Sequence, residues 1–180
     1  FVDENFTISS LKKYIPNTEY SYVSDLLKTS DLKKDLLFFE INSKKTIIKV
    51  SIKKDIKISD IENLGAKFHS FINYDKKKEY FVDSDTINNK IKNFVGYFLH
   101  GLKLKSYEFN IYKSKKNKKL VSINIIGNKN KISTQDHLRF KALEKGSFFA
   151  RDLVSEPGNV LHPDEYAKRI NSLKKFGLKI

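Results

Sequence analysis

The stretch DLLFFEINSKKTIIKVSIKKDIKISDIENLGAKFHSFIN, residues 35–73, contains two kinds of hydrophobic pattern. Residues 35–41 include a short apolar run, and residues 46–52 alternate isoleucine and valine with polar residues, so both segments are predicted to be strands. Asn42–Lys45 lies between them and predicts a hairpin loop. After residue 58 the spacing changes to three and four residues, which predicts a helix. Its apolar face carries Ile61, Leu64, Phe68, Phe71 and Ile72.

Further strands and helices alternate along the rest of the chain. Ser59 and Glu62 have the spacing of a capping box for the first helix. Tyr80–Val82 is expected to be a short strand, and Asp83, Ser84 and Asp85 are expected to cap the helix that follows. Gly101 is expected to end that helix. Its predicted apolar stripe is Ile87, Ile91, Phe94, Val95, Phe98 and Leu99.

The second half of the chain is predicted to hold two strands and two helices. The strands are Tyr107–Tyr112 and Leu120–Ile126, joined by the lysine-rich segment Lys113–Lys119. A long helix is expected over Thr134–Ser155, ended by Pro157 and Gly158. Its predicted apolar face is Leu138, Ala142, Phe149, Ala150 and Leu153.

The last predicted helix begins at Pro163, a residue favoured at the first helical position. Gly177 is expected to end it. Its predicted buried side is Tyr166, Ala167, Ile170 and Leu173. Alternating strands and helices predict an α/β layered fold, and the hairpin-like connections favour a mixed sheet over an all-parallel one.

The composition excludes several classes of protein. The chain has 180 residues, of which 39% are hydrophobic, and no apolar run approaches the roughly 18 residues of a membrane span. Residues 1–20 lack the pattern of a secretory signal, and the absence of cysteine excludes disulfides and thiolate metal sites. A cytoplasmic protein fits this composition. Because the chain starts at Phe1, has no methionine and finishes on what resembles the opening of a strand, we expect a fragment of a longer protein.

The net charge of +14 suggests nucleic acid as one possible partner. Only three of the 35 basic residues are arginines, at positions 139, 151 and 169, and arginine is the side chain best suited to bidentate contacts with phosphate or guanine. The abundant lysines are therefore interpreted as a solvated surface. Binding of phosphates by Lys113–Lys119 remains the alternative.

Motifs for catalysis are missing from the chain. It contains no glycine-rich phosphate loop, no HExxH and no GxSxG. The histidines are far apart in sequence: we expect His69 and His100 to be packing residues, His137 to lie in the first turn of a helix and His162 to lie at a helix cap. The acid pairs also have structural explanations, with Asp83 and Asp85 in a turn and cap and Asp164–Glu165 in the first turn of a helix.

Two segments resemble one known family. ARDLVSEPGNVLHP, residues 150–163, resembles the A-R-D-L-V-N-x-P-x-N-x-L-T-P signature of the leucyl aminopeptidase (cytosol aminopeptidase) family. GLKLKSYEFNIYKS, residues 101–114, is similar to that family's G-x-x-L-x-x-Y-x-F-x-x-Y-K-S segment, and both occur in the family's order. Ser155 and His162 depart from the signature, where the family usually has Asn and Thr.

The resemblance implies a macro-domain-like amino-terminal domain over residues 1–133, with a mixed sheet and helices on both faces. An interdomain helix over 134–156 and the start of a truncated catalytic domain over 157–180 would follow. The parent would be a cytoplasmic, homohexameric metallopeptidase that releases amino-terminal residues from peptides with two divalent metals, Mn, Zn or Mg. Some members also contact DNA.

The family's metal-binding and catalytic residues come later than the matching segments. We therefore expect no catalytic, metal-binding or cofactor-binding residue in this chain, and no membrane association. Two alternatives remain: a basic nucleic-acid-binding module, and a macro-like pocket for ADP-ribose that rests on fold analogy alone.

Overall fold

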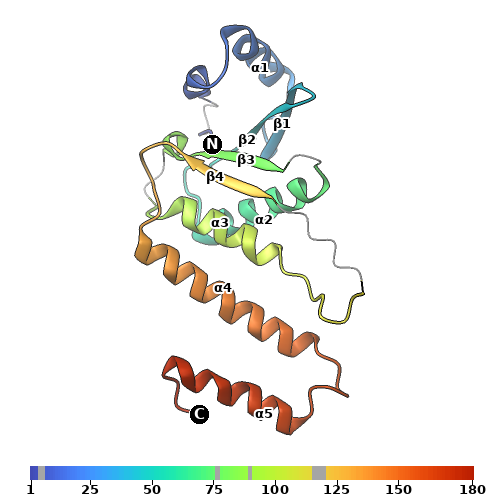
Figure 1. Ribbon diagram of the computed structural model, residues 1–180. Helices are drawn as coiled ribbons and strands as arrows, with labels where there is room; N and C mark the ends of the chain where they lie inside the picture. The colour runs from blue at the N-terminus through green and yellow to red at the C-terminus, as the bar shows by residue number, and fades with distance from the viewer. Residues whose placement is uncertain (4–6, 76–77, 89–90, 115–120) are drawn as a thin grey trace.

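The computed structural model describes residues 1–3, 7–75, 78–88, 91–114 and 121–180 (Figure 1). The helices are α1 (Asn17–Thr29), α2 (Ile58–Tyr74), α3 (Phe94–Lys105), α4 (Thr134–Ser155) and α5 (Pro163–Asn171). The strands are β1 (Leu36–Asn42), β2 (Lys45–Val50), β3 (Glu79–Asp83) and β4 (Ser122–Ile126). Three short 3-10 turns, η1 (Ser9–Lys13), η2 (Ser84–Thr86) and η3 (Ser172–Phe176), complete the described elements.

The predicted hairpin is confirmed. β1 and β2 pair antiparallel, with Phe38 opposite Ile48 and a register shift near the turn. The Asn42 side chain accepts hydrogen bonds from the backbone amides of Lys44 and Lys45, both at 2.9 Å. This is the local turn chemistry that makes asparagine common in such loops.

The described strands form two pairs, one of each kind. β3 and β4 pair parallel, with Val82 opposite Ile125, whereas β1 and β2 are antiparallel. The mixture of strand directions expected from the sequence is therefore confirmed. In the part of the chain that the structure describes, no strand joins the two pairs into one sheet.

Helices cover both faces of the β1–β2 pair, as expected. On one face, Phe39 packs in a small hydrophobic cluster with Val23 and Leu27 of α1. On the other face, the Phe38 ring stacks on Phe71 of α2 with ring centroids 3.7 Å apart. In Figure 1 the chain then descends from α2 and α3 to α4 and α5, so that α5 lies at the far end from α1.

The main core lies between α2, α3 and the strands. Ile61, Phe94, Val95 and Phe98 are each at most 1% exposed. Burying a phenylalanine or isoleucine side chain contributes roughly 1.5–3 kcal/mol, so packing between these helices is a large stabilising contribution to the fold.

Two glycines set the separation of α2 and α3. A Cβ atom on Gly65 would lie 1.9 Å from the carbonyl oxygen of Phe98, and one on Gly101 would lie 2.0 Å from the carbonyl oxygen of Glu62. Gly101 was expected to end α3, but the helix continues to Lys105. The close approach of the α2 backbone, and not a helix end, explains why this position is a glycine.

The starts of α2 and α3 also differ from the prediction. α2 begins at Ile58, and the Asp60 carboxylate accepts a hydrogen bond of 3.0 Å from the Lys57 amide, so Ser59 is not the cap. α3 begins only at Phe94, because Asn93 has a left-handed backbone with φ of 60°. Ile87 precedes the helix, although its side chain is buried as expected.

The strand predicted at Tyr107–Tyr112 is wrong. This segment has no regular structure and pairs with no strand in the described residues. The hydroxyls of Tyr107 and Tyr112 instead bond to carboxylates at the end of α4. β4 confirms the other predicted strand from Ser122 onward. The loop expected between these strands falls largely on residues 115–120, outside the described residues.

α4 has the predicted bounds but not the predicted apolar face. Phe140 is its one buried residue in the described structure, whereas Leu138 is 61% exposed. α5 begins at Pro163 and the turn after it ends at Gly177, with φ of 84°, as predicted. Tyr166 and Ala167 are exposed, because few neighbouring side chains lie against α5.

Candidate functional site

The four histidines do not come together. His69 lies on α2, His100 on α3, His137 in the first turn of α4, and His162 just before α5. Among the residues that the structure describes, no three histidine or acidic side chains are placed so that they could hold a metal ion.

His100 has a structural role at the meeting point of three helices. Its Nδ1 lies 2.9 Å from Glu62 Oε1 on α2, and its ring lies 5.5 Å from the Phe140 ring on α4. His100 is 8% exposed, so it is a packing residue as predicted. His69 is half-buried, and burial lowers the pKa of its imidazole.

The Asp83 and Asp85 pair forms a turn, as interpreted from the sequence, but it does not cap α3, which begins only at Phe94. Asp83 Oδ1 accepts a hydrogen bond of 3.0 Å from the Asp85 amide. Asp85 Oδ1 accepts bonds of 2.7 and 2.6 Å from the amides of Asn128 and Lys129. These two backbone bonds hold the pKa of Asp85 below its usual value, and they fix the loop after β4 against η2.

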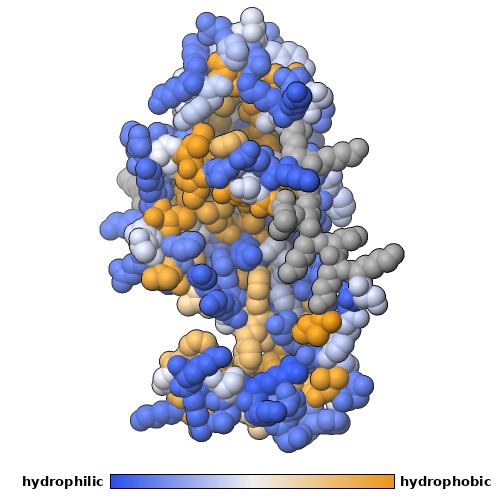
Figure 2. Space-filling view, in the orientation of Figure 1, coloured by the Kyte–Doolittle hydropathy of each residue, from blue (hydrophilic) through white to orange (hydrophobic). Residues whose placement is uncertain are grey.

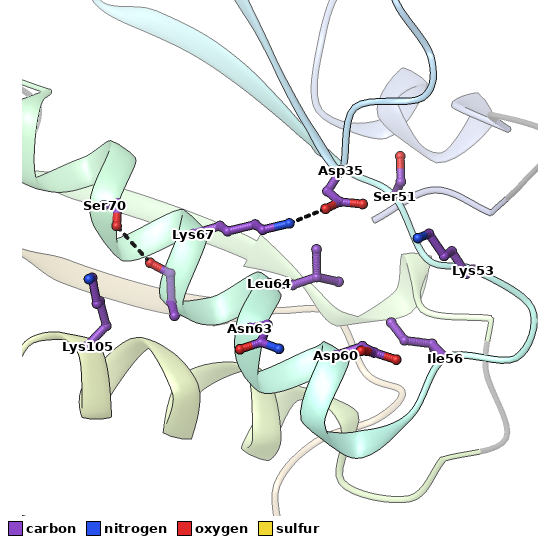
Figure 3. Close-up of a pocket in the computed structure, with 11 residues that line it drawn as sticks. Asp35, Ser51, Lys53, Ile56, Asp60, Asn63, Leu64, Lys67, Ser70 and Lys105 are labelled. Carbon is purple, nitrogen blue, oxygen red and sulfur yellow. Dashed lines mark hydrogen bonds and ion pairs between the residues drawn. The ribbon is translucent and has the colours of Figure 1, made fainter.

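A shallow cleft of about 410 Å³ lies beside α2 (Figure 3). Lys67 reaches from α2 to the Asp35 carboxylate, so these two charges in the cleft are already paired. Lys105 of α3 and Lys53 after β2 lie at its margins. The cleft contains no histidine or other arrangement for acid–base or nucleophilic chemistry.

The two segments that resemble the aminopeptidase family are in contact. Arg151 Nη1 donates a hydrogen bond of 2.6 Å to the carbonyl oxygen of Leu104, and its guanidinium lies 5.4 Å from the centre of the Tyr107 ring. The Tyr107 hydroxyl donates a bond of 2.8 Å to Asp152 Oδ1. Burial and this bond raise the pKa of Tyr107.

Glu156 extends this contact to α5. One of its oxygens accepts a hydrogen bond from the Tyr112 hydroxyl, and the other lies 2.9 Å from Arg169 Nη1. The Glu156 side chain is only 3% exposed. The Tyr112 hydroxyl and then the Arg169 guanidinium hold the pKa of Glu156 below its usual value, so this carboxylate is charged at neutral pH.

These contacts define the candidate functional site, which we call the α4–α5 junction: Tyr107, Tyr112, Arg151, Asp152, Glu156 and Arg169. It is a structural joint and holds no group placed for catalysis. Sequence reasoning missed Arg169 and Tyr112 as partners of Glu156, because their separations of 13 and 44 residues follow no local periodicity.

The comparisons with known proteins agree with the family resemblance. No family-wide sequence profile matches the chain. A probable cytosol aminopeptidase of Clostridium perfringens is 28% identical over 171 residues, which are 89% of this chain and 33% of that protein. The corresponding protein of Phytoplasma mali is 36% identical over 118 residues, 60% of this chain and 23% of its own length.

Solved structures show the same likeness in fold. A tomato leucine aminopeptidase variant has a TM-score of 0.67 and 20% identity, covering 96% of this chain and 37% of that one. A bottromycin maturation enzyme, BotP, in complex with Mn has a TM-score of 0.65 and 14% identity, covering 85% of this chain and 33% of that one.

The molecule therefore has the mixed α/β fold of the amino-terminal domain of leucine aminopeptidase. The resemblance to the cytosol aminopeptidase family is confirmed in both sequence and fold. The chain spans about a sixth to a third of the length of the curated relatives that it matches. In its described residues, no helix is long and apolar enough to cross a membrane.

Proposed function

We propose that this chain is the amino-terminal, non-catalytic part of a cytosolic leucyl aminopeptidase. The whole enzyme would release amino-terminal residues from peptides, and two divalent metals, Mn, Zn or Mg, would activate the attacking water and stabilise the oxyanion. The likeness to curated cytosol aminopeptidases over up to 89% of the chain supports this assignment.

We expect the residues that bind such metals to lie outside the described part of this chain. In the described part, no group of three histidine or acidic side chains is arranged for a metal ion. We derive no catalytic step from these residues, and we expect the isolated chain to be inactive.

The observation that carries the proposal is the α4–α5 junction. Both family-like segments contribute to it, and its bonds run from residues just after α3 through the end of α4 to Arg169 of α5. These hydrogen bonds are exposed or part-buried, so each contributes little to stability and their main effect is on geometry. The proposed role of the chain is therefore to hold whatever follows α4 in a fixed orientation.

The experiment is hydrolysis of leucine p-nitroanilide with added manganese, for the chain alone and for a full-length enzyme that contains it. We expect turnover by the full-length enzyme and none by the chain. Turnover by the pure chain would contradict the non-catalytic role. If neither cleaves, the aminopeptidase assignment fails and the likeness reflects ancestry only.

We propose a second role for the chain in assembly and binding. The resemblance implies a homohexameric parent, and the net charge of +14 favours weak, sequence-independent contact with DNA or RNA. The proposed Lys113–Lys119 contact falls largely outside the described residues. This role does not depend on the catalytic one.

A further inference from the structure

The cleft beside α2 has more positive charges than its own carboxylates neutralise. Three lysines line it: Lys53 after β2, Lys67 on α2 and Lys105 at the end of α3. The carboxylates of Asp35 and Asp60 line it as well. Three ammonium groups against two carboxylates leave one surplus positive charge in the cleft.

Both carboxylates of the cleft already have partners in the protein. Asp60 Oδ2 accepts a hydrogen bond of 3.0 Å from the Lys57 amide at the start of α2. Asp35 is paired with Lys67. By contrast, the other two lysines of the cleft form no ion pair with a carboxylate among the described residues. These two ammonium groups are therefore available to a ligand.

The cleft is elongated along α2 (Figure 3). Asp60 and Ser70 both line it, and ten residues of helix span about 15 Å. In Figure 3, Lys53 lies near the Asp60 end, Lys105 lies near the Ser70 end, and Lys67 lies between them. The positive charges of the cleft are therefore spread along one direction.

The ion pair between Lys67 and Asp35 can open at small cost. The two side chains are 56% and 28% exposed, and exposed pairs of this kind contribute little to stability. The Asp35 backbone is fixed, because its carbonyl oxygen accepts a hydrogen bond of 2.8 Å from the Ser51 amide. An anion in the cleft can thus take the place of Asp35 beside the long Lys67 side chain.

The floor of the cleft is formed before any ligand binds. Ile56 and Leu64 line it, are 8% and 5% exposed, and belong to the main hydrophobic core. The volume of about 410 Å³ lies at the lower end of the roughly 300–1,000 Å³ that small-molecule sites occupy. The cleft therefore suits a small elongated molecule better than a single ion.

We propose that this cleft binds an elongated anion with several phosphate groups in a row, either a free oligophosphate or the phosphate chain of a nucleotide. Lys53 and Lys105 bind its two ends, and Lys67 releases Asp35 and binds its middle. Lysine binds phosphate as a compact point charge, and no arginine of the described structure lines the cleft to form the bidentate fork that suits carboxylates. The site does not depend on the proposed aminopeptidase activity.

Positive charge alone does not distinguish this site from the rest of the surface. The chain has a net charge of +14, and hydrophilic side chains cover much of the face shown in Figure 2. A test of the cleft therefore needs a lysine that lies elsewhere and is equally exposed. Lys141 on α4 meets this need, because it is exposed and does not line the cleft.

The test is titration with inorganic tripolyphosphate at about 50 mM salt, followed by NMR of the backbone amides. We expect the amides of Asn63 and Ser70 to shift. Lys105→Gln should weaken binding about two- to fivefold and Lys141→Gln less than twofold. Lys67→Gln should weaken it more than Lys105→Gln, because it also leaves the Asp35 carboxylate without its partner. Equal losses in Lys105→Gln and Lys141→Gln would overturn the proposal.

Replacing Asp35 tests the exchange of partners directly. Asp35→Asn frees Lys67 and should strengthen binding about two- to fivefold. Asp25→Asn is the matched control, because Asp25 also holds a lysine in an exposed pair, with Lys28 at 2.9 Å, and its loss changes the net charge equally. Equal strengthening by both variants would show that net charge governs binding and would contradict a site in the cleft.

Two further probes define the ligand. Orthophosphate reaches one lysine at a time, so it should bind about tenfold more weakly than tripolyphosphate; equal affinity would exclude an elongated site. Adenosine triphosphate should show the same dependence on Lys67 and Lys105 as tripolyphosphate. If it binds without that dependence, the phosphate chain of a nucleotide is not a ligand of this cleft.

A thermal midpoint is measured for each variant, because Asp35 also opposes the lowering by burial of the Lys49 pKa. If Asp35→Asn does not fold, the comparison of Lys67→Gln and Lys105→Gln with Lys141→Gln decides the question.

Discussion

Glu156 connects more of the molecule than its position between two helices suggests. One oxygen of its carboxylate accepts a hydrogen bond from the Tyr112 hydroxyl, and the other accepts one from the Arg169 guanidinium. No residue of α5 is fully buried in the described structure, so few apolar contacts compete with these bonds in fixing the helix.

Replacement of Glu156 by glutamine should therefore release α5. Glu156→Gln keeps the size of the side chain but removes the charge that attracts Arg169. We expect faster hydrogen exchange across the α5 amides, Tyr166 and Ile170 included, with little change in the α2–α3 core. Glu40→Gln, an exposed position on β1, is the matched control. Unchanged exchange in α5 would show that the Glu156 carboxylate does not hold this helix.

For a chain that begins at Phe1, the Phe1 amino group predicts a pH dependence of stability. Its pKa falls from 8.0 to about 6 on folding, so between these values the unfolded chain binds more protons than the folded chain. The free energy of unfolding should then rise from pH 6 to pH 8, by at most roughly 2–3 kcal/mol at about 1.4 kcal/mol per pKa unit.

Acetylation of the amino group provides the control for this pH dependence. An acetylated chain cannot titrate at Phe1, so its free energy of unfolding should be flatter between pH 6 and pH 8 than that of the unmodified chain. Urea unfolding at each pH measures both curves. Parallel curves would assign the pH dependence to other groups.

At the scale of elements, the helix pair α2–α3 depends on backbone contact. A methyl group on Gly101 has no room beside the Glu62 carbonyl. Gly101→Ala should lower the free energy of unfolding by about 1–3 kcal/mol or more, because α2 and α3 must move apart.

Gly146 offers a matched comparison within α4. A Cβ atom there would meet nothing within 4 Å. Gly146→Ala should raise the free energy of unfolding by about 0.5–1 kcal/mol, because alanine favours the helix. Urea unfolding of both variants measures these changes in the free energy of unfolding. Changes of the same sign and size at Gly101 and Gly146 would refute the close-contact explanation.

Element prediction from sequence succeeded where periodicity was strong and local. The bounds of α4 and the β1–β2 hairpin followed from spacing and turn residues alone. The strand prediction for Tyr107–Tyr112 failed because its aromatic side chains contact α4, and no neighbouring strand pairs with its backbone in the described structure. The predicted apolar face of α4 was wrong because its one buried residue in the described structure, Phe140, is selected by packing against Gly96, Tyr97 and His100 of α3 and not by the helix's own pattern.

At the scale of the whole molecule, the surplus of positive charge predicts salt-sensitive binding. We expect the chain to bind duplex DNA weakly at low salt, with affinity that falls about tenfold or more between 50 and 200 mM salt. Fluorescence anisotropy with two unrelated duplex sequences tests this, and we expect similar affinities for both because arginine is scarce. Absence of binding at 50 mM salt would rule out the nucleic-acid role.

The family likeness was visible in two short segments of the sequence, but the contact between these segments was not. The sequence placed residues 101–114 and 150–163 in the right order, and only the fold shows that Arg151 and Asp152 bond to Leu104 and Tyr107. Such pairs are 45 to 47 residues apart, so nothing in local spacing predicts them. The division of the chain at residues 133 and 156 stays a prediction.

Contacts at two positions along α4 fix the orientation of this helix. Phe140 fixes it against α3, and the contacts of Arg151 and Asp152 fix it again from eleven residues later, about 16 Å along the axis. A rod pinned at two points acts as a strut, whereas a rod pinned at one point swings. If the contacts of Arg151 and Asp152 are both lost, a tilt of about 10° around Phe140 moves the end of α4 by roughly 4 Å. Precision at the far end of the molecule thus depends on a few polar contacts between the end of α4 and the segment after α3.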